Sequence, residues 1–199
     1  MSTPQSPVDA VGINPYRIHV SQRYLDLTRQ KLELTRLPRE PRSAHGALAT
    51  DVGVAKSTLE PLVDHWLEDY DWRAQETRFN DGLPQFRAAV AGTRLHYIHR
   101  SSSAPNAIPL LFVHGWPDSF LTVAPMIDAL CDPVSSPSKS QPGPPAFHVV
   151  APTIPGFGFS DNVTEEGNNF HSTAEMFDGL MKRLGYMQYM VHGLSLIHI

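Results

Sequence analysis

Residues that could take part in chemistry gather in a short loop, His114-Gly115-Trp116-Pro117, that directly follows an apolar run. The run, 110–113, is rich in branched and aromatic side chains, which is typical of a strand buried on both faces of a parallel sheet. Gly115 permits unusual backbone angles and Pro117 cannot donate to a strand ladder, so the strand ends here. Because ligands and reacting groups collect at the carboxyl ends of strands in open α/β sheets, this loop is the first candidate for a functional site.

A second candidate is Ser195, which lies in the sequence Gly193-Leu194-Ser195-Leu196-Ile197. A hydrolase nucleophile on an α/β fold needs a sharp strand-to-helix turn flanked by small residues, and Gly193-x-Ser195 has part of that pattern. Two places after the serine stands Ile197, whose β-branched side chain suits a strained turn poorly. A serine nucleophile is therefore an alternative interpretation and not the leading one.

Two further patterns favour structural roles. His96 and His99 lack a third ligand at metal spacing and face opposite sides of the strand predicted at 95–99, so we expect surface residues and no metal site. Gly156-x-Gly158 follows a predicted strand but lacks the third glycine that opens a helix in a dinucleotide site. We expect this pair to shape the mouth of the functional site.

These motifs resemble those of epoxide hydrolases with the α/β-hydrolase fold. The stretch 114–120, HGWPDSF, resembles the family's HGWPGSF with aspartate in place of the usual second glycine, and 155–160, PGFGFS, resembles a second family motif. Upstream, 14–21 and 70–73 resemble the N-terminal domain of the microsomal-type branch. The resemblance runs from about residue 13 to residue 193, and its motifs occur in the family's order.

The resemblance implies a reaction as well as a fold. An aspartate would open an epoxide, and a histidine-activated water would hydrolyse the aspartyl ester to a vicinal diol without a metal or organic cofactor. The backbone N–H of Trp116 would be an oxyanion-hole donor, a contact worth about 3 kcal/mol, and the bond from Trp116 to Pro117 would be cis. The residues that would shape the surrounding loops are His114, Gly115, Pro117, Gly156 and Gly158.

The resemblance ends abruptly after Gly193. Ser195 stands at the family's aspartate position, and the segment 194–199 does not follow the family pattern. The family's acid, histidine and lid tyrosines come later in chain order and would lie beyond residue 199. We therefore interpret the chain as a truncated epoxide hydrolase that is inactive as written. The alternatives are a serine esterase that uses Ser195 and a non-catalytic fragment.

Composition limits the possible partners. The hydrophobic content of 41% allows a normal core, and the formal charge of −4, without a basic run, disfavours a nucleic-acid partner. The expected partner is a small hydrophobic epoxide, and nothing in the sequence predicts an oligomeric state. A single cysteine excludes an internal disulfide. Without a secretory signal or a run of about 18 apolar residues, we expect no membrane span and a cytoplasmic location.

The elements that must position the candidate residues predict an α/β protein. We expect an incomplete α/β-hydrolase fold, with the N-terminal half of the sheet, preceded by a helical meander. The predicted parts are a flexible N-terminus over 1–12, an epoxide-hydrolase-type meander over 13–85, a partial core over 86–193 and an atypical tail over 194–199.

Local signals place helices and strands within these parts. The meander should contain a helix capped by Ser21 and ended by Pro38 and Pro41, then one that starts with the capping box 57–60. The apolar side of the second helix, which includes Trp66, should lie against a large surface. The core elements predicted are a hairpin over 86–99, the strand 110–113, a helix over 118–131 with Pro125 inside it, a strand over 147–151, a helix with the capping box 172–175 that ends at Gly185, and a strand from Gln188.

Overall fold

The structure of the protein is a computed structural model that describes residues 12–39, 54–133, 143–163 and 169–194. The predicted flexible N-terminus and the predicted tail lie almost entirely outside these ranges. The described chain forms two compact units, which are treated in turn.

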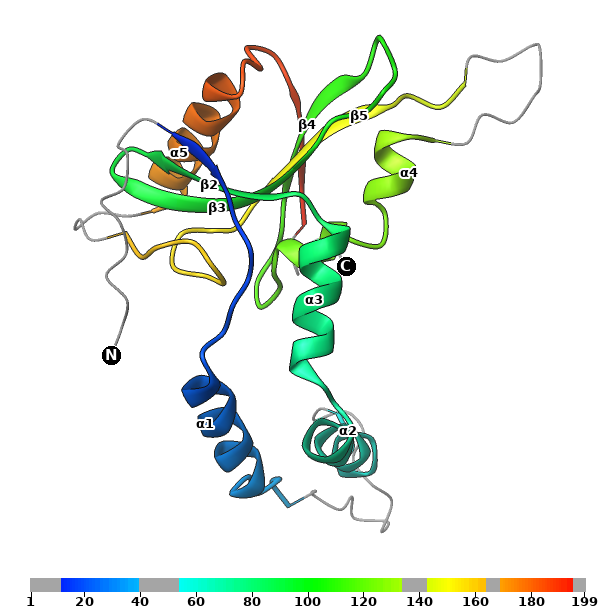
Figure 1. The fold of residues 1–199 in the computed structure, drawn as a ribbon, viewed down its shortest axis with the longest axis vertical. Helices are drawn as coiled ribbons and strands as arrows, with labels where there is room; N and C mark the ends of the chain where they lie inside the picture. The colour runs from blue at the N-terminus through cyan, green and yellow to red at the C-terminus, as the bar shows by residue number, and fades with distance from the viewer. Residues whose placement is uncertain (1–11, 40–53, 134–142, 164–168, 195–199) are drawn as a thin grey trace, which may run out of the picture. The chain divides into compact units, whose positions relative to one another are not determined.

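The larger unit comprises Met1–Ile18 and Phe79–Ile199 and is built on a six-stranded sheet with the order β1-β2-β3-β5-β4-β6 (Figure 1). β4 pairs in parallel with β5 on one side and with β6 on the other, while β1, β2, β3 and β5 are joined by antiparallel pairs. The predicted hairpin and the three predicted core strands are therefore confirmed. The strands are β1 (Ile13–Pro15), β2 (Gln85–Val90), β3 (Thr93–Arg100), β4 (Ile108–Val113), β5 (Phe147–Pro152) and β6 (Met190–Gly193).

Helical segments cover both faces of this sheet (Figure 1). One face carries α5 (Phe170–Arg183), whose buried side chains form a single apolar cluster with strand residues that include Tyr97. Side chains alternate along a strand, so His96 points to the opposite face. There its ring lies 4.6 Å from a phenylalanine ring of η2 (Phe120–Val123), and α4 (Ile127–Cys131) contacts β5. β6 is one of the two edge strands of the described sheet, and all of its residues are exposed.

The single helix predicted over 118–131 is wrong. The chain instead forms η2 and α4, separated by the three residues 124–126. Pro125 has no N–H to donate, and its ring clashes with the preceding turn of an α-helix, so the helix cannot run through this point. The entry to η2 is stabilised by Ser119, whose hydroxyl accepts a hydrogen bond from the Leu121 N–H at 3.3 Å.

Both predicted capping boxes are misplaced. α2 (Lys56–Glu68) starts before Ser57, with Ala55 at the N-cap and no side-chain cap bond. α5 is capped by Asn169, which accepts from the Ser172 N–H at 3.1 Å while the Ser172 hydroxyl accepts from the Asn169 N–H at 3.0 Å. Asparagine caps helices as well as serine does. The real box therefore begins three residues before the predicted one.

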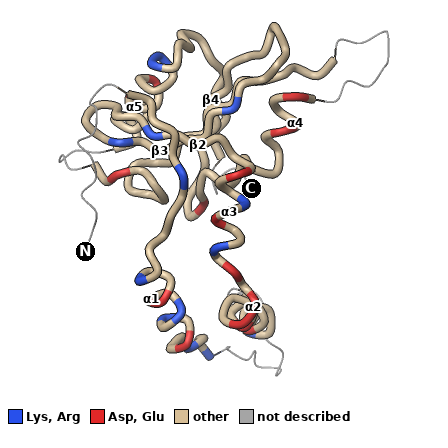
Figure 2. Tube along the Cα trace, in the orientation of Figure 1, with Lys and Arg blue, Asp and Glu red and all other residues tan. Residues whose placement is uncertain are grey.

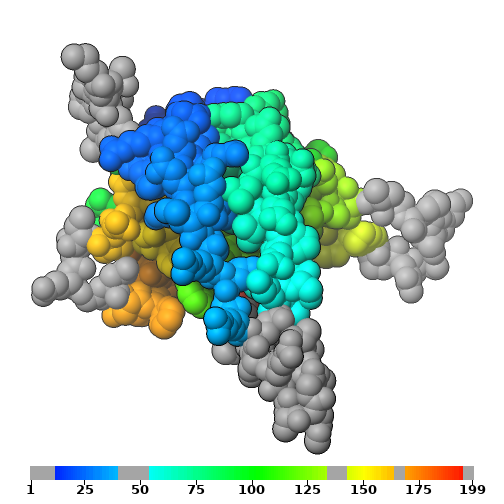
Figure 3. Space-filling model, turned by 90° about the horizontal axis from the view of Figure 1, so that it is seen from below, coloured from blue at the N-terminus to red at the C-terminus, as the bar shows by residue number. Residues whose placement is uncertain are grey.

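The smaller unit, His19–Arg78, consists of α1 (Gln22–Glu33), α2 and most of α3 (Trp72–Gly82). α1 and α2 lie side by side (Figure 3), and Arg29 of α1 donates to the Leu67 carbonyl of α2 at 3.0 Å. Positive and negative residues both occur along α1 (Figure 2), so this helix presents no stripe of one sign. No helix in the described ranges is long and apolar enough to cross a membrane.

Three expectations about this unit are corrected by the structure. α1 ends at Glu33, with Leu34 at the C-cap, and so stops before Pro38 and Pro41, which were predicted to end it. Ser21 occupies the N-cap without a side-chain cap bond. The apolar side of α2 contains no buried residue within the described chain, and Trp66 is 51% exposed. α3 was not predicted.

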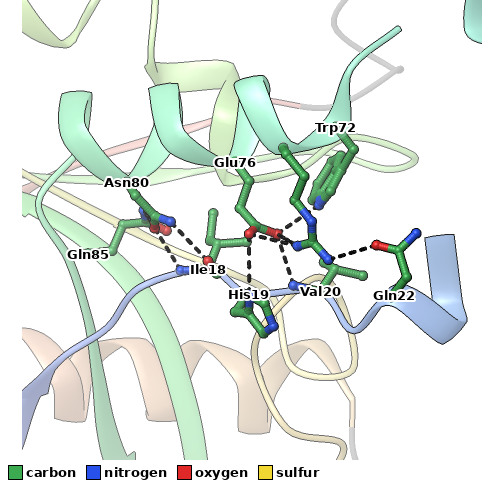
Figure 4. Close-up of polar contacts among 9 residues, drawn as sticks. Ile18, His19, Val20, Gln22, Trp72, Glu76, Asn80 and Gln85 are labelled. Carbon is green, nitrogen blue, oxygen red and sulfur yellow. Dashed lines mark hydrogen bonds and ion pairs between the residues drawn. The ribbon is translucent and has the colours of Figure 1, made fainter.

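The carboxylate of Glu76, on α3, is the centre of a polar network (Figure 4). Glu76 is 7% exposed and accepts from the Val20 N–H at 2.9 Å, from Trp72 Nε1 at 2.8 Å and from the Arg73 guanidinium at 2.9 Å. Burial raises the pKa of Glu76, but these hydrogen bonds and the charge of Arg73 together outweigh it and hold the pKa below its ordinary value.

A second side chain of α3 repeats this arrangement. Asn80 accepts from the Ile18 N–H at 2.7 Å and donates to the Ile18 carbonyl at 2.9 Å (Figure 4). Glu76 and Asn80 are four residues apart and so lie on one side of the helix. Side chains of α3 thus satisfy backbone groups of the extended segment 18–20 that a neighbouring strand would satisfy in a sheet.

We predict that Glu76→Gln lowers the free energy of unfolding by about 1–3 kcal/mol at pH 7, because the uncharged amide forms weaker hydrogen bonds with the Arg73 guanidinium and the backbone. Because the pKa of Glu76 is lower in the folded state, its stabilisation is present above the unfolded pKa. That stabilisation disappears as pH falls through the folded pKa. Urea unfolding at several pH values measures the effect.

The matched control is Glu33→Gln, which removes an ion pair between the half-exposed Glu33 and Arg29 on the surface of α1. We expect a change of less than about 1 kcal/mol. Equal losses in the two variants would contradict the role assigned to the Glu76 network.

Candidate active site

The structure places the predicted loop at the carboxyl end of β4, next to the end of β6. Val113, the last residue of β4, pairs with Gly193, the last residue of β6. The pairing continues one step further, because the Leu194 N–H donates to the Val113 carbonyl at 3.0 Å. The loop that begins at His114 therefore lies beside the point where the chain leaves β6, and the two segments of the predicted site are brought together.

Within this loop the Trp116–Pro117 peptide bond is cis, as the resemblance implied. The Trp116 N–H has no hydrogen-bond partner among the described residues, and the indole side chain is 65% exposed. The other end of the same peptide is fixed, because the Gly115 carbonyl accepts from the Asp118 N–H at 3.2 Å. The loop thus holds this peptide from its carbonyl side and leaves the Trp116 N–H without a partner among the described residues.

His114 is buried beneath this loop, with 2% exposure. Its Nε2 accepts from the Ile154 N–H at 3.1 Å, and its Nδ1 lies 2.9 Å from the Gly115 carbonyl oxygen. The imidazole therefore connects the loop after β4 to the loop after β5. Its side chain does not reach the exposed side of the site, which fits the loop-shaping role predicted for it.

The second loop, which follows β5, contains the two predicted glycines. Gly156 has a φ of 83° and Gly158 a φ of 47°, a region that other residues rarely adopt. The turn is anchored to β3, because Asp161 forms an ion pair with Arg94 at 2.6 Å. The Asp161 carbonyl also accepts from the Gly156 N–H at 3.0 Å. The shape of this loop thus depends both on glycine and on its attachment to the sheet.

The prediction that His96 is a surface residue is wrong. Its side chain is fully buried, with Nδ1 2.7 Å from Thr153 Oγ1 and Nε2 3.0 Å from Gln85 Oε1. Burial lowers the pKa of His96 to about 3, with a smaller contribution from the nearby charge of Arg87, so the ring is neutral at neutral pH. His96 is a structural residue of the sheet beneath the second loop.

Two serines in the predicted motifs differ in what the structure describes of them. Ser195 lies outside the described residues, so its predicted role as a nucleophile stays a prediction. Ser160 was missed as an individual residue, although it closes the PGFGFS motif. Its hydroxyl accepts from the His96 N–H at 3.0 Å and donates to the Thr153 carbonyl at 2.8 Å. A hydroxyl at the end of a glycine-rich turn is the signal that could have identified it.

A hollow of about 580 Å³ lies elsewhere, in the smaller unit, between α1 and the junction of α2 and α3. Its lining includes Arg29, Trp66 and Trp72 and contains none of the predicted site residues. The candidate site is therefore defined by the loop after β4 and not by this hollow.

Comparison with known proteins agrees with the geometry. A family model described as "Epoxide hydrolase N terminus" matches residues 13–123, more than half of the chain. The chain belongs to the epoxide hydrolase family. A relative from Stigmatella aurantiaca (strain DW4/3-1) is 36% identical over 182 residues, which cover 92% of this chain and 40% of the relative. "Epoxide hydrolase 1" of Oryctolagus cuniculus is 32% identical over 188 residues, with 92% and 39% covered.

Solved structures of epoxide hydrolases show the same fold. The crystal structure of juvenile hormone epoxide hydrolase from the silkworm Bombyx mori matches with a TM-score of 0.74 at 28% identity, and the match covers 92% of this chain and 46% of that one. The predicted α/β-hydrolase fold, in its incomplete form, is therefore confirmed. This epoxide hydrolase chain spans about two-fifths of the length of the curated relatives it matches.

The positive φ of Gly158 in the second loop leads to a prediction about the stability of this epoxide hydrolase chain. Gly158→Ala should lower the free energy of unfolding by at least about 1–2 kcal/mol, because a Cβ at φ +47° is strained. The new methyl would also lie 3.2 Å from Thr153 Cγ2. The matched control is Gly82→Ala, which has nothing within 4 Å and should leave stability unchanged or raise it. Thermal unfolding compares the two, and equal midpoints would contradict the prediction.

Proposed function

We propose that this chain is the N-terminal portion of an enzyme that hydrolyses a small hydrophobic epoxide to a vicinal diol. Membership of the epoxide hydrolase family supports the reaction class. In this proposal an aspartate after β6 attacks an epoxide carbon and forms an ester, and the ring oxygen receives a proton and becomes a hydroxyl. A water activated by histidine then hydrolyses the ester, which releases the diol and restores the carboxylate.

One observation carries the role assigned to this part of the enzyme. The Trp116 N–H has no partner among the residues described, and it belongs to the loop that lies beside the end of β6. Hydrolysis of the ester places negative charge on the oxygen of a tetrahedral intermediate. A fixed N–H beside the nucleophile position can stabilise that charge, so we assign the Trp116 amide to the oxyanion hole.

The remaining predicted residues receive supporting roles in this proposal. His114, Gly115 and Pro117 set the shape of the first loop, and Gly156 and Gly158 set the shape of the second. The meander over 13–85 and the core over 86–193 are proposed as the parts of the chain, and a cytoplasmic location stays a prediction from sequence. No metal or organic cofactor enters the proposed reaction.

The chain 1–199 is predicted to form no diol by itself, because the acid, base and proton donors of the reaction are not among its motifs. Purified protein should be incubated with a hydrophobic aryl epoxide and the products separated by chromatography. "Epoxide hydrolase 1" of Oryctolagus cuniculus, run in parallel, is the positive control. Diol formation by 1–199 above the rate in buffer would contradict this prediction.

The reaction class itself is tested by the native coding sequence after Gly193. We expect Asp-Trp-Gly at the positions now occupied by 195–197, and the encoded protein should convert the epoxide. When a single turnover is run in ¹⁸O-labelled water, the first diol should lack the label, because its new oxygen comes from the carboxylate. The sequence LSLIHI followed by a stop codon in both gene and transcript would overturn the proposal.

A serine esterase is distinguished from this proposal by a covalent probe. A fluorophosphonate should leave 1–199 unlabelled, since Ile197 does not suit a nucleophile turn. Ser195→Ala is the control for any background reaction. Labelling that disappears in Ser195→Ala would favour the serine enzyme over the epoxide hydrolase.

A further inference from the structure

The Gly115 carbonyl and the Trp116 N–H are the two ends of one planar peptide group. They point in opposite directions, so whatever fixes the carbonyl also fixes the direction of the N–H. The Gly115 oxygen accepts from two donors, His114 Nδ1 at 2.9 Å and the Asp118 N–H at 3.2 Å. The orientation of the proposed oxyanion donor, the Trp116 N–H, is therefore set by contacts on the opposite side of the peptide, at the Gly115 carbonyl oxygen.

The geometry decides which nitrogen of His114 carries the proton. A backbone N–H can only donate, so the contact of 3.1 Å from the Ile154 N–H makes Nε2 the acceptor. A neutral ring then carries its hydrogen on Nδ1, which faces the Gly115 oxygen. Both contacts are satisfied by this one tautomer, and the buried ring is locked between the two loops.

The Thr153–Ile154 peptide is held in the same way, with a donor bound to its carbonyl and its N–H directed at the next group. The Ile154 N–H that reaches His114 shares its peptide with the Thr153 carbonyl, and this carbonyl accepts from the Ser160 hydroxyl at 2.8 Å. Ser160 Oγ in turn accepts from the His96 N–H of β3 at 3.0 Å. That bond occupies an acceptor position on the oxygen and leaves the hydroxyl hydrogen directed at Thr153.

We propose that Ser160 and His114 are positioning residues that orient and polarise the Trp116 N–H through a one-directional series of hydrogen bonds. Each group accepts at one end and donates at the other, so each bond polarises the next, by about 10–30% per bond. The proposal rests on the function proposed above for the Trp116 amide. The groups in donor-to-acceptor order are the His96 N–H, the Ser160 hydroxyl, the Thr153–Ile154 peptide, the His114 ring and the Gly115–Trp116 peptide.

Nuclear magnetic resonance of isotopically labelled 1–199 tests this series without requiring turnover. In the unmodified protein the His114 ring should show a protonated Nδ1 and an unprotonated Nε2. Ser160→Ala removes the donor to Thr153, and the Trp116 amide proton should then shift upfield as its polarisation weakens. Ser160→Thr keeps a hydroxyl and should restore the original position.

The control is Ser103→Ala, which removes a hydroxyl bound to Asp132 at 3.1 Å on the surface of the same unit. It should leave the Trp116 resonance unchanged. Well-dispersed amide signals from β3, β4 and β5 establish that each variant is folded. If Ser160→Ala keeps dispersed amide signals from β4 but loses those of the second loop, the position of the Trp116 amide proton in Ser160→Thr decides the outcome.

Two results would overturn the proposal. The first is a His114 ring protonated on Nε2 in the unmodified protein. The second is a Trp116 amide shift that is the same in Ser160→Ala as in Ser103→Ala. Failure of the function proposed above would leave both resonances as predicted and would appear only in the assays of epoxide turnover, so the two failures are distinguishable.

Discussion

The constraint on which the site depends is the pairing of β4 on both of its edges. Its two edges are hydrogen-bonded in parallel to β5 and β6, and its central residues are buried on both faces of the sheet. Its last two residues, Phe112 and Val113, are held by their pairing with β6, so the end of the strand has a fixed position. The loop from His114 to Pro117 begins at that end and inherits its position. This explains how the loop can hold the Trp116 N–H in one direction without a partner for it among the described residues.

The parts of the fold that sequence could predict are those specified by local signals. The apolar run 110–113 identifies β4, the HGWP stretch identifies its loop, and Gly185 ends α5 with a φ of 89° as expected. The two capping predictions were wrong for different reasons. Asn169 and Ser172 are both good capping residues within one turn of α5, whereas α2 has Ala55 at its N-cap, which forms no side-chain cap bond. Ser57 and Ser172 have the right chemistry, but the chain uses Ala55 and Asn169 at those helix starts.

Long-range contacts explain the failures in the sheet and the site. The strand pattern at His96 predicts opposite faces for neighbouring side chains, which is correct. It does not show that η2 covers the face on which His96 lies. The partners of this ring, Gln85 and Thr153, are 11 and 57 residues away in sequence. For the same reason Ser160 could be placed in a motif but not given a role, since its contacts are with β3 and the end of β5.

The exposed outer strand has a consequence for handling the protein. β6 is paired on one side only within the described sheet, and Met190 and Val191 on it are 53% and 63% exposed. Unpaired backbone groups beside apolar side chains are a template on which another chain can add a strand. Preparations of 1–199 should thus lose material to self-association as they are concentrated, and dilute samples with added solubilising partners are the suitable form for spectroscopy.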